Sequence, residues 1–484
     1  MKISYRVRFV GGSKYQKSLD TEASAAGIPI PHPPAGDADK AKPRRTKSRS
    51  GCKECRTRRV KCDETYPVCL RCQRRGSICR SATRPVQWHT EMPWLSHSVV
   101  LDSWTGHATP NKRLVQFWIE QTSHMMALDR NNNPLSLPLL QYLAACPSLL
   151  HAVQSVSAGH ETFFSSESLR TCLEERGLAL KLLREEVQDP GQMSISSMLT
   201  VFVLGVSSPW IELRPNAYGK EHLDGARALI KHMLSHKRMR EDSLAKFLLG
   251  WYLYWDMSSS FLDTTEGASR SEADDIVAVL HSDDCFHPMI GFSSELYALV
   301  ATVGRHCRWV LENETTLPGL EQDLRDRLLA WQPGHHDKHL VNLSLAYRNH
   351  GILMLYRTCE TPVASACKTS SEETQPGDTA ETECAVRSLV LESICMMLKT
   401  PLSEPCANFQ SLPLLSAGAE LMSTDEELRN NVKARFKGLY SSSRVMVNMW
   451  AIELLEELWD LHDCGVNVSW IDLCTTKGWN LCFS

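Results

Sequence analysis

Residues 51–80 read GCKECRTRRVKCDETYPVCLRCQRRGSICR, a stretch with six cysteines and nine Lys or Arg residues. A segment this short and polar cannot bury an ordinary apolar core. Its cysteines are spaced C-x2-C-x6-C, and after six further residues the same spacing is repeated. The repeated thiol pattern predicts that bound metal, rather than apolar side chains, holds the segment in one shape.

The spacing also determines how much metal the segment can bind. The six candidate ligands are Cys52, Cys55, Cys62, Cys69, Cys72 and Cys79. Structural zinc binds four thiolates, so two ions need eight sulfur–metal bonds, and six thiolates supply eight only if two of them bridge. We predict two Zn²⁺ per chain, with the equivalent Cys52 and Cys69 as bridges. The alternative, one zinc on Cys52, Cys55, Cys69 and Cys72, leaves Cys62 and Cys79 without a role.

The charge of the chain is divided unevenly. Residues 40–84 carry sixteen Lys or Arg residues against three acidic residues, a net charge of +13. Because the whole chain has a net charge of −3, the remainder carries −16. A compact positive module joined to an acidic body indicates a polyanion as the ligand of the module.

The rest of the composition indicates an intracellular and mostly globular protein, since 43% of the residues are hydrophobic. The N-terminus does not resemble a signal peptide, and the longest apolar run, MLTVFVLGV at 198–206, is about half a membrane span. We therefore expect reduced cysteines and no membrane partner. The chain contains no Walker loop, G-x-S-x-G or H-E-x-x-H motif, so we expect no enzyme.

Composition divides the chain into four parts. Residues 1–39, with the Pro-rich IPIPHPPAGDAD, are predicted to be disordered. The basic metal module occupies 40–84 and begins with KAKPRRTKSR, which indicates either a nuclear-import signal or an extension of a nucleic-acid surface. Residues 85–107 form a linker with two prolines. Residues 108–484 form an all-α body with a disordered loop near 368–383.

The all-α prediction for the body depends on apolar residues at helical spacing. Leucines between Leu169 and Leu183 recur at intervals of three, four and seven, and a second stripe ends in Trp251 and Trp255. Thr109-Pro110 predicts an N-cap and first turn. Further helices are predicted at 146–160, 195–206, 222–234, 295–311, 321–331, 341–358, 385–398 and 444–462.

Residues around the cysteines carry a specific resemblance. They are Arg56, Arg58, Arg59, Val60, Lys61, Asp63 and Pro67. With the cysteines, they resemble the fungal Zn2Cys6 binuclear cluster family of transcription factors. The resemblance implies that each half is a metal-binding loop followed by a short helix, and that the first helix enters the DNA major groove at a CGG-type triplet.

Six cations are the predicted DNA contacts: Arg56, Arg58, Arg59, Lys61, Arg74 and Arg75. An arginine can donate two hydrogen bonds to guanine, worth about 1–3 kcal/mol of discrimination. By the resemblance, Arg58 and Arg59 lie on the short first helix and read bases, although many relatives have lysine at the second position. The other four are assigned to phosphates, which fix register without reading sequence. The alternative, that the cations only offset the cluster charge of −2, accounts for two of them.

The body carries a second resemblance, to the fungal-specific transcription factor domain. It depends on five stretches in order: NNNPLSLPLLQYLAACPSLLHAVQSVSAGH at 131–160, HLDGARALI at 222–230, LRDRLLAWQP at 324–333, AYRNHGILMLYR at 346–357 and LPLLSAGAE at 412–420. The resemblance implies an all-α regulatory region without an enzymatic role.

These features predict a nuclear, sequence-specific transcription factor for RNA polymerase II genes, with double-stranded DNA as partner; family association points to a metabolic or biosynthetic gene cluster. The alternative is a zinc-stabilised interaction scaffold or ubiquitin-ligase-like protein without DNA specificity. A homodimer through the body, the transcription machinery and a small-molecule effector stay open as partners, and residues 80–107 show no heptads. The sequence predicts neither target genes nor activation against repression.

Overall fold

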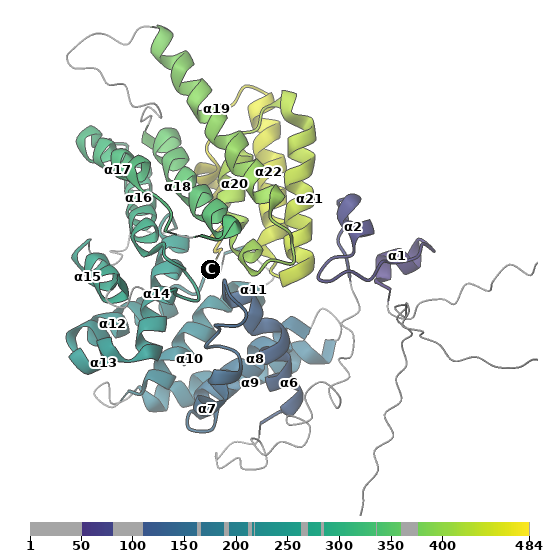
Figure 1. The fold of residues 1–484 in the computed structure, drawn as a ribbon, viewed down its shortest axis with the longest axis vertical. Coiled ribbons are helices and arrows are strands. Elements are labelled where there is room, and N and C mark those ends of the chain that lie inside the picture. Colours follow the sequence, from purple (N-terminus) through teal and green to yellow (C-terminus); the bar gives the residue numbers. More distant parts are fainter. Residues whose placement is uncertain are drawn as a thin grey trace, which may run out of the picture. The chain divides into compact units, whose positions relative to one another are not determined.

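Helices dominate the chain, as Figure 1 shows. The computed structural model describes residues 51–80, 110–161, 166–187, 193–211, 215–216, 218–262, 270–281, 285–334, 336–359 and 376–483. Within these ranges it has no β-strand, and one isolated bridge joins His287 and Gly291. The prediction of an all-α protein is therefore confirmed. The segments 1–39 and 85–107, predicted to be disordered and a linker, lie outside the described residues.

Two short helices belong to the cysteine segment. They are α1 (Lys53–Thr57) and α2 (Leu70–Arg74), each of five residues. A helix of this length is not stable alone in water, because its nucleation cost exceeds what its few hydrogen bonds return. The packing of the cysteines around a common centre must therefore hold both helices.

The other helices of the described residues build the body, and most of them are longer than α1 and α2. They are α6 (Lys112–Phe117), α7 (Leu140–Leu143), α8 (Pro147–Glu161), α9 (Ser166–Glu186), α10 (Ile195–Val206), α11 (Ser208–Ile211), α12 (Lys220–Ser235), α13 (Lys237–Glu241), α14 (Ser243–Ser259), α15 (Arg270–His281), α16 (Ser294–Asn313), α17 (Pro318–Ala330), α18 (Lys338–Cys359), α19 (Pro376–Lys399), α20 (Ser411–Ala419), α21 (Glu426–Ser443), α22 (Val447–Asp463) and α23 (Trp470–Lys477). Single turns of 3₁₀ helix lie at Ser123–Met126, Leu137–Leu139, Pro405–Phe409 and Ser423–Asp425, and a π-turn at Trp118–Thr122.

Helix α14 lies at the centre of the body. Asp242 caps it, since its Oδ1 accepts hydrogen bonds from the backbone N–H groups of Leu244 at 2.8 Å and Ala245 at 3.0 Å. Nearly every side chain of the helix is buried, and Trp251 and Trp255 have no exposed surface. A helix that is buried all round belongs inside a helical domain rather than on its surface. The aromatic stripe predicted at 251–255 is therefore core.

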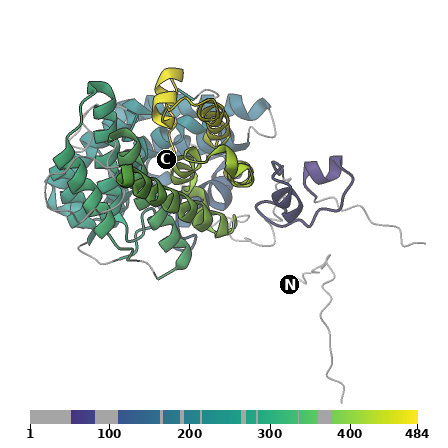
Figure 2. The same ribbon diagram turned by 90° about the horizontal axis from the view of Figure 1, so that it is seen from above.

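Buried tyrosines connect α14 to its neighbours. The Tyr254 hydroxyl donates to the carbonyl of Phe483 at 3.1 Å, and the Tyr347 hydroxyl on α18 donates to the carbonyl of Phe409 at 2.8 Å. Both rings pack edge-on against Tyr297 of α16. Helix α16 thus packs between α14 and α18, an arrangement that can be followed in Figures 1 and 2.

Most of the predicted helices are present. The ranges predicted at 146–160, 195–206, 222–234, 295–311, 321–331, 341–358, 385–398 and 444–462 fall on α8, α10, α12, α16, α17, α18, α19 and α22. The last begins three residues later than predicted, because Arg444 has a left-handed backbone (φ 60°) that ends α21.

Two local predictions differ from the structure. The first body helix begins at Lys112 and not at Pro110, because Asn111 is its N-cap and its side chain accepts from the backbone N–H of Leu114. Thr109, predicted as the cap, lies outside the described residues. In the polar stretch 368–383, predicted as a loop, α19 begins at Pro376. Proline suits the first turn of a helix, where its missing N–H would have no partner.

Candidate metal centre

The cysteine segment folds as two similar halves. In each half the first cysteine is the N-cap of a helix, and its sulfur accepts a hydrogen bond from the backbone N–H of the second cysteine. The distance is 3.3 Å from Cys55 N to Cys52 Sγ and 3.4 Å from Cys72 N to Cys69 Sγ. The C-x2-C spacing produces this arrangement, since an N-cap side chain reaches the N–H group three residues on.

The halves also end alike. The N–H of Arg59 donates to the carbonyl of Arg56, and the N–H of Gly76 donates to that of Gln73, both at 3.0 Å. Arg59 and Gly76 are seventeen residues apart, as are the cysteine pairs, and both have a left-handed backbone, with φ of 56° and 58°. The sequence repeat is therefore a repeat of backbone conformation.

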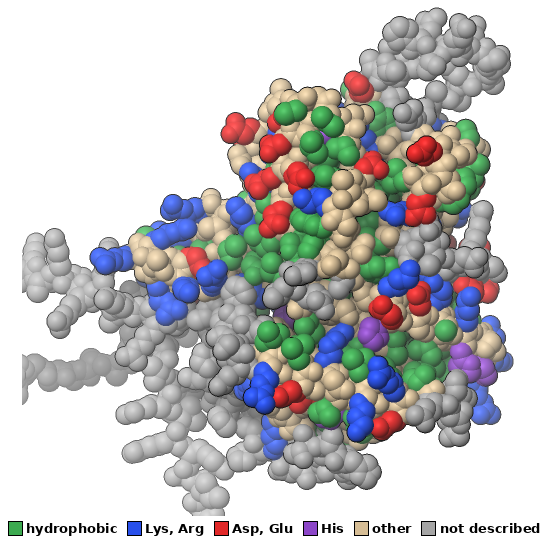
Figure 3. Space-filling model, turned by 180° about the vertical axis from the view of Figure 1, so that it is seen from behind, with side chains coloured by type: hydrophobic (Ala, Val, Ile, Leu, Met, Phe, Trp, Pro, Cys, Tyr) green, Lys and Arg blue, Asp and Glu red, His purple; other side chains and the backbone are tan. Residues whose placement is uncertain are grey.

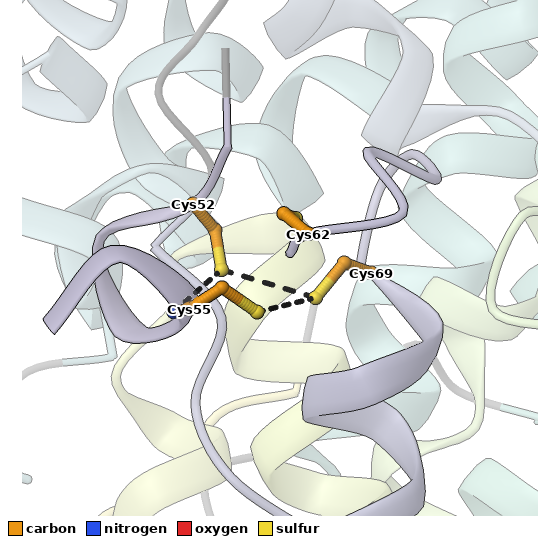
Figure 4. A group of neighbouring side chains, drawn as sticks. All are labelled: Cys52, Cys55, Cys62 and Cys69. Atoms are coloured by element: carbon orange, nitrogen blue, oxygen red, sulfur yellow. Dashed lines mark hydrogen bonds between the residues drawn. The ribbon is translucent and has the colours of Figure 1, made fainter. Parts of the chain in front are cut away.

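The sulfur atoms form two overlapping groups. Cys52, Cys55, Cys62 and Cys69 make one group, in which all four sulfurs lie within 4.8 Å of one another; Cys52, Cys69, Cys72 and Cys79 make the other. Cys52 and Cys69 belong to both, and their sulfurs are 3.8 Å apart. Figure 4 shows the sulfurs of Cys52, Cys55 and Cys69 pointing toward one another. Two tetrahedral ions that share two thiolates need this arrangement.

Burial controls the ionisation of these thiols. It raises the pKa of Cys52 to about 12, although the backbone N–H of Cys55 acts in the opposite direction. Burial also opposes ionisation at Cys69, but hydrogen bonds from Cys72 and the neighbouring thiols outweigh it and lower the pKa of Cys69. Because a metal binds the thiolate, zinc has to displace protons from this group of sulfurs, and its affinity must fall in acid.

All six predicted DNA-contacting cations are exposed: Arg56, Arg58, Arg59, Lys61, Arg74 and Arg75. Figure 3 shows Lys and Arg side chains gathered on the cysteine segment, whereas basic and acidic side chains are intermixed over the helical body. The surface of the segment can therefore meet a polyanion, as the charge count predicts.

The placement of two of these cations on a helix needs correction. Helix α1 ends at Thr57, Arg58 is its C-cap, and Arg59 lies beyond it with a left-handed backbone. The prediction that the first helix carries both arginines is thus wrong, because the chain turns where the repeat has Gly76. Their side chains lie at the C-terminal end of the helix and not along its face.

Acidic residues within the basic segment have structural roles that the sequence reasoning did not assign. Asp63 accepts hydrogen bonds from the backbone N–H groups of Leu70 at 2.9 Å and Arg71 at 3.1 Å, and so holds the first turn of α2. Desolvation opposes its ionisation, but these bonds and those from Thr65 lower the pKa of Asp63 to about 2. Glu54 accepts from the N–H of Arg80 at 2.6 Å and ties the end of the segment to α1. The presence of acidic residues among nine cations is the sequence feature that could have indicated these structural roles.

Comparisons with known proteins agree with this geometry. The model of the fungal specific transcription factor domain matches residues 113–484, and that of the fungal Zn(2)-Cys(6) binuclear cluster domain matches residues 50–89. The chain belongs to the family of fungal specific transcription factor domain proteins. The cluster domain binds two zinc ions, and the thiol arrangement fits them, so the cofactor prediction is confirmed.

Curated relatives include several transcription factors of fungi. The chain is 31% identical over 138 residues to a Zn(2)-C6 fungal-type transcription factor, afumD, of Aspergillus fumigatus, which covers 24% of this chain and 32% of the relative. It is 41% identical over 64 residues to the aspercryptin biosynthesis cluster-specific transcription regulator of Emericella nidulans (13% and 9%), and 48% over 50 residues to the transcriptional regulatory protein moc3 of Schizosaccharomyces pombe (10% and 9%). The chain therefore matches a third or less of the length of these relatives. No solved structure matches it.

Membership of the family supports a DNA-binding transcription regulator and implies a non-enzymatic role. In the part of the chain that the structure describes, none of the helices combines the length and the apolar character that a membrane span requires.

Proposed function

We propose that this protein is a nuclear, sequence-specific regulator of RNA polymerase II genes that binds CGG-type triplets in the major groove through residues 40–84. The observation that carries the proposal is the exposed pair Arg58 and Arg59 directly after α1. Two cysteines of the thiol cluster belong to this helix: Cys52 is its N-cap and Cys55 is its third residue. The metal thereby fixes the position of the two side chains that would read bases. A resemblance to transcription factors in the same segment supports this proposal.

The zinc ligands in this proposal are the six cysteines. One ion is bound by Cys52, Cys55, Cys62 and Cys69, and the other by Cys52, Cys69, Cys72 and Cys79. The support for this assignment is the proximity of the sulfurs within each group. Zinc supplies structural bonds here and no catalytic chemistry, because each ion has four protein ligands and no open position.

Arg59 is the proposed principal reader of guanine. A left-handed backbone costs a residue with a Cβ about 1–2 kcal/mol, and the equivalent position in the second half is a glycine, which does not incur that cost. An arginine retained in a strained conformation is best explained by a role of its side chain. Arg58 is the second base contact, and Arg56, Lys61, Arg74 and Arg75 are the proposed phosphate contacts.

The genes under control are proposed to form a metabolic or biosynthetic cluster. The printed name of one relative, a regulator specific for the aspercryptin biosynthesis cluster, supports this class of target. That relative matches over 64 residues, 13% of this chain, so its own pathway is not transferred to this chain.

The helical body is the proposed regulatory part, through a homodimer, the transcription machinery or a small-molecule effector. The effector has support in an apolar pocket lined by Met126, Trp210, Trp251 and Phe483 among others. The indole N–H groups of Trp210 and Trp251 have no hydrogen-bond partner among the described residues. A largely apolar pocket suits a small apolar ligand.

The test of DNA reading uses the purified zinc-loaded chain and a pool of random duplexes, with competition measured at physiological salt. We expect enrichment of CGG-type triplets. Arg59→Ala should lose discrimination at one base, whereas its matched control Lys61→Ala should weaken all duplexes alike and flatten the salt dependence. Equal losses on all sequences for both variants would contradict the assignment, and no enrichment in the wild type would contradict the function.

A further inference from the structure

Three side chains of the kind that bind metals meet inside the helical body, far in sequence from the cysteine segment. His306 lies on α16, where it is followed by Cys307; Glu321 lies on α17, and Cys359 is the last residue of α18. Their exposed fractions are 7% for His306 and Cys359, 3% for Glu321 and 0% for Cys307. Ionisable and thiol groups buried together in this way need partners.

The ligand atoms are close enough for one ion. The distance from His306 Nε2 to Glu321 Oε1 is 3.0 Å, and the ligand atoms of His306, Glu321 and Cys359 all lie within 4.8 Å of one another. Around a tetrahedral zinc ion with bonds of about 2.0–2.3 Å, ligand atoms are about 3.3–3.8 Å apart. Shifts of about 1 Å would therefore convert the group into a coordination sphere.

We propose that His306, Glu321 and Cys359 bind a zinc ion within the helical body. A donor set of one imidazole, one carboxylate and one thiol is one that borderline-soft zinc accepts. A buried hydrogen-bonded His–Glu pair would account for two of these residues, but it gives no reason for the thiol within 4.8 Å of both. The site is independent of the cysteine segment and of its proposed DNA binding.

The surroundings of the ligands are suited to hold them. The backbone N–H of Leu317 donates to Glu321 Oε1 at 2.8 Å, which orients the carboxylate at the start of α17. The ring of Trp309 stacks on His306 with centroids 6.0 Å apart and an angle of 19° between planes. Contacts such as these, made to the ligands and not to the metal itself, orient metal ligands in known sites. An ion here would join α16, α17 and α18.

A metal that binds Cys359 must first displace the proton of its thiol, and this lowers the affinity for metal. The neighbouring thiol of Cys307 and burial raise the pKa of Cys359, so the free group is neutral at physiological pH. Zinc would displace that proton and bind the thiolate. Metal at this position therefore enters as the body folds, because the ligands are buried in the finished domain.

The experiment counts metal in the chain of 484 residues, purified under reducing conditions and without added chelator. Native mass spectrometry and elemental analysis of first-row metals should find three zinc ions in the wild type. Cys359→Ala and His306→Phe should each contain two. The matched control is Cys474→Ala, another buried cysteine, on α23; it should keep three. Two zinc ions in the wild type would overturn the proposal.

A second variant keeps the test decisive if a body variant fails to fold. The double variant Cys52→Ser, Cys69→Ser removes both shared thiols of the cysteine segment and should leave one zinc ion in the body. Adding Cys359→Ala to it should leave none. A double variant that contains no zinc while its far-ultraviolet circular dichroism shows an intact helical body would refute the body site. That result would leave the proposed function of the cysteine segment untouched.

Discussion

The cysteine segment and the helical body are stabilised in different ways. In the segment the buried side chains are mainly thiols, and the six cysteines are each at most 6% exposed. In the body the largest buried side chains are aromatic, with Trp118, Trp251 and Trp255 wholly enclosed. Burial of a large apolar side chain contributes about 1.5–3 kcal/mol. The segment has almost no such contribution and depends on metal, whereas the body has many.

The difference has a consequence for function. A segment that needs no apolar core can expose most of its other side chains, and its Lys and Arg side chains gather at its surface (Figure 3). The body must instead cover its core, and its charges are of both signs (Figure 3). In the segment, bound metal therefore stabilises the fold, and the exposed side chains remain available to bind a charged ligand.

Chelation should separate the two regions most strongly. Removing zinc from the whole chain of 484 residues should abolish specific DNA binding, a loss of at least about 1,000-fold, because metal binding and folding are one equilibrium in a small zinc module. The helical signal of the body should persist at room temperature, since its core is apolar. Fluorescence anisotropy with a labelled duplex and far-ultraviolet circular dichroism measure the two effects. Re-addition of zinc is the control, and joint loss of both signals would contradict the comparison.

Shared and unshared cysteines should differ within the segment. Cys52→Ser removes a sulfur common to both groups, and we expect it to lower the zinc content by two ions. Cys62→Ser removes a sulfur of one group only and should lower it by one. Zinc per chain, measured against the wild type by elemental analysis, gives the answer. Equal losses in the two variants would argue against bridging thiolates.

Arg59→Gly should stabilise the segment while it weakens DNA reading. Glycine adopts the left-handed backbone of this position without the steric cost, so resistance to a competing chelator should rise by about 1 kcal/mol in free energy. The matched control is Arg58→Gly at φ −81°, where glycine relieves nothing and costs about 0.5–1 kcal/mol. If Arg59→Gly were the less stable of the two, the strain argument would be wrong.

The sequence predicts the repeated halves of the cysteine segment, but not the end of its first helix or the contacts of Asp63. The repeat of cysteine spacing predicts two equivalent halves, and the overlapping sulfur groups have the geometry that the count of bonds requires. Spacing alone does not show where a five-residue helix ends, which is why Arg59 was placed on it. Superposing the two halves would have set Arg59 against Gly76 and revealed the turn. The bonds of Asp63 depend on tertiary proximity, which spacing does not encode.

In the body, helical periodicity predicts helices better than it predicts burial. The leucines that predict α9 include Leu169 and Leu173, which are 41% and 55% exposed, while Cys172 and Ala179 of the same helix are buried. Periodicity reports one apolar face, but the packing partner decides which face is covered. Helix α21 was not predicted, because polar residues obscure its stripe of Val432, Phe436 and Leu439, all of which are buried.

Acid should lower the free energy of unfolding of the body, because its apolar core buries a histidine. His350 on α18 is 1% exposed, its Nδ1 has no hydrogen-bond partner among the described residues, and burial lowers its pKa to about 3. The pKa in the unfolded chain is about 6.5. The neutral side chain is thus favoured by folding, so its stabilising effect is complete above pH 6.5 and is lost as the pH falls toward 3.

His350→Leu should remove that part of the pH dependence. At pH 5.5 the unfolded wild type gains about 1.4 kcal/mol by binding a proton that the folded chain excludes. The drop in the free energy of unfolding between pH 8 and pH 5.5, measured by urea denaturation of the body's helical signal, should therefore be smaller in the variant by about that amount. His336→Leu, at an exposed position, controls for the added leucine. If the decrease in the free energy of unfolding were the same in His350→Leu as in the wild type, His350 would have to bind its proton within the folded core. Burial in the body would then not exclude a charged side chain.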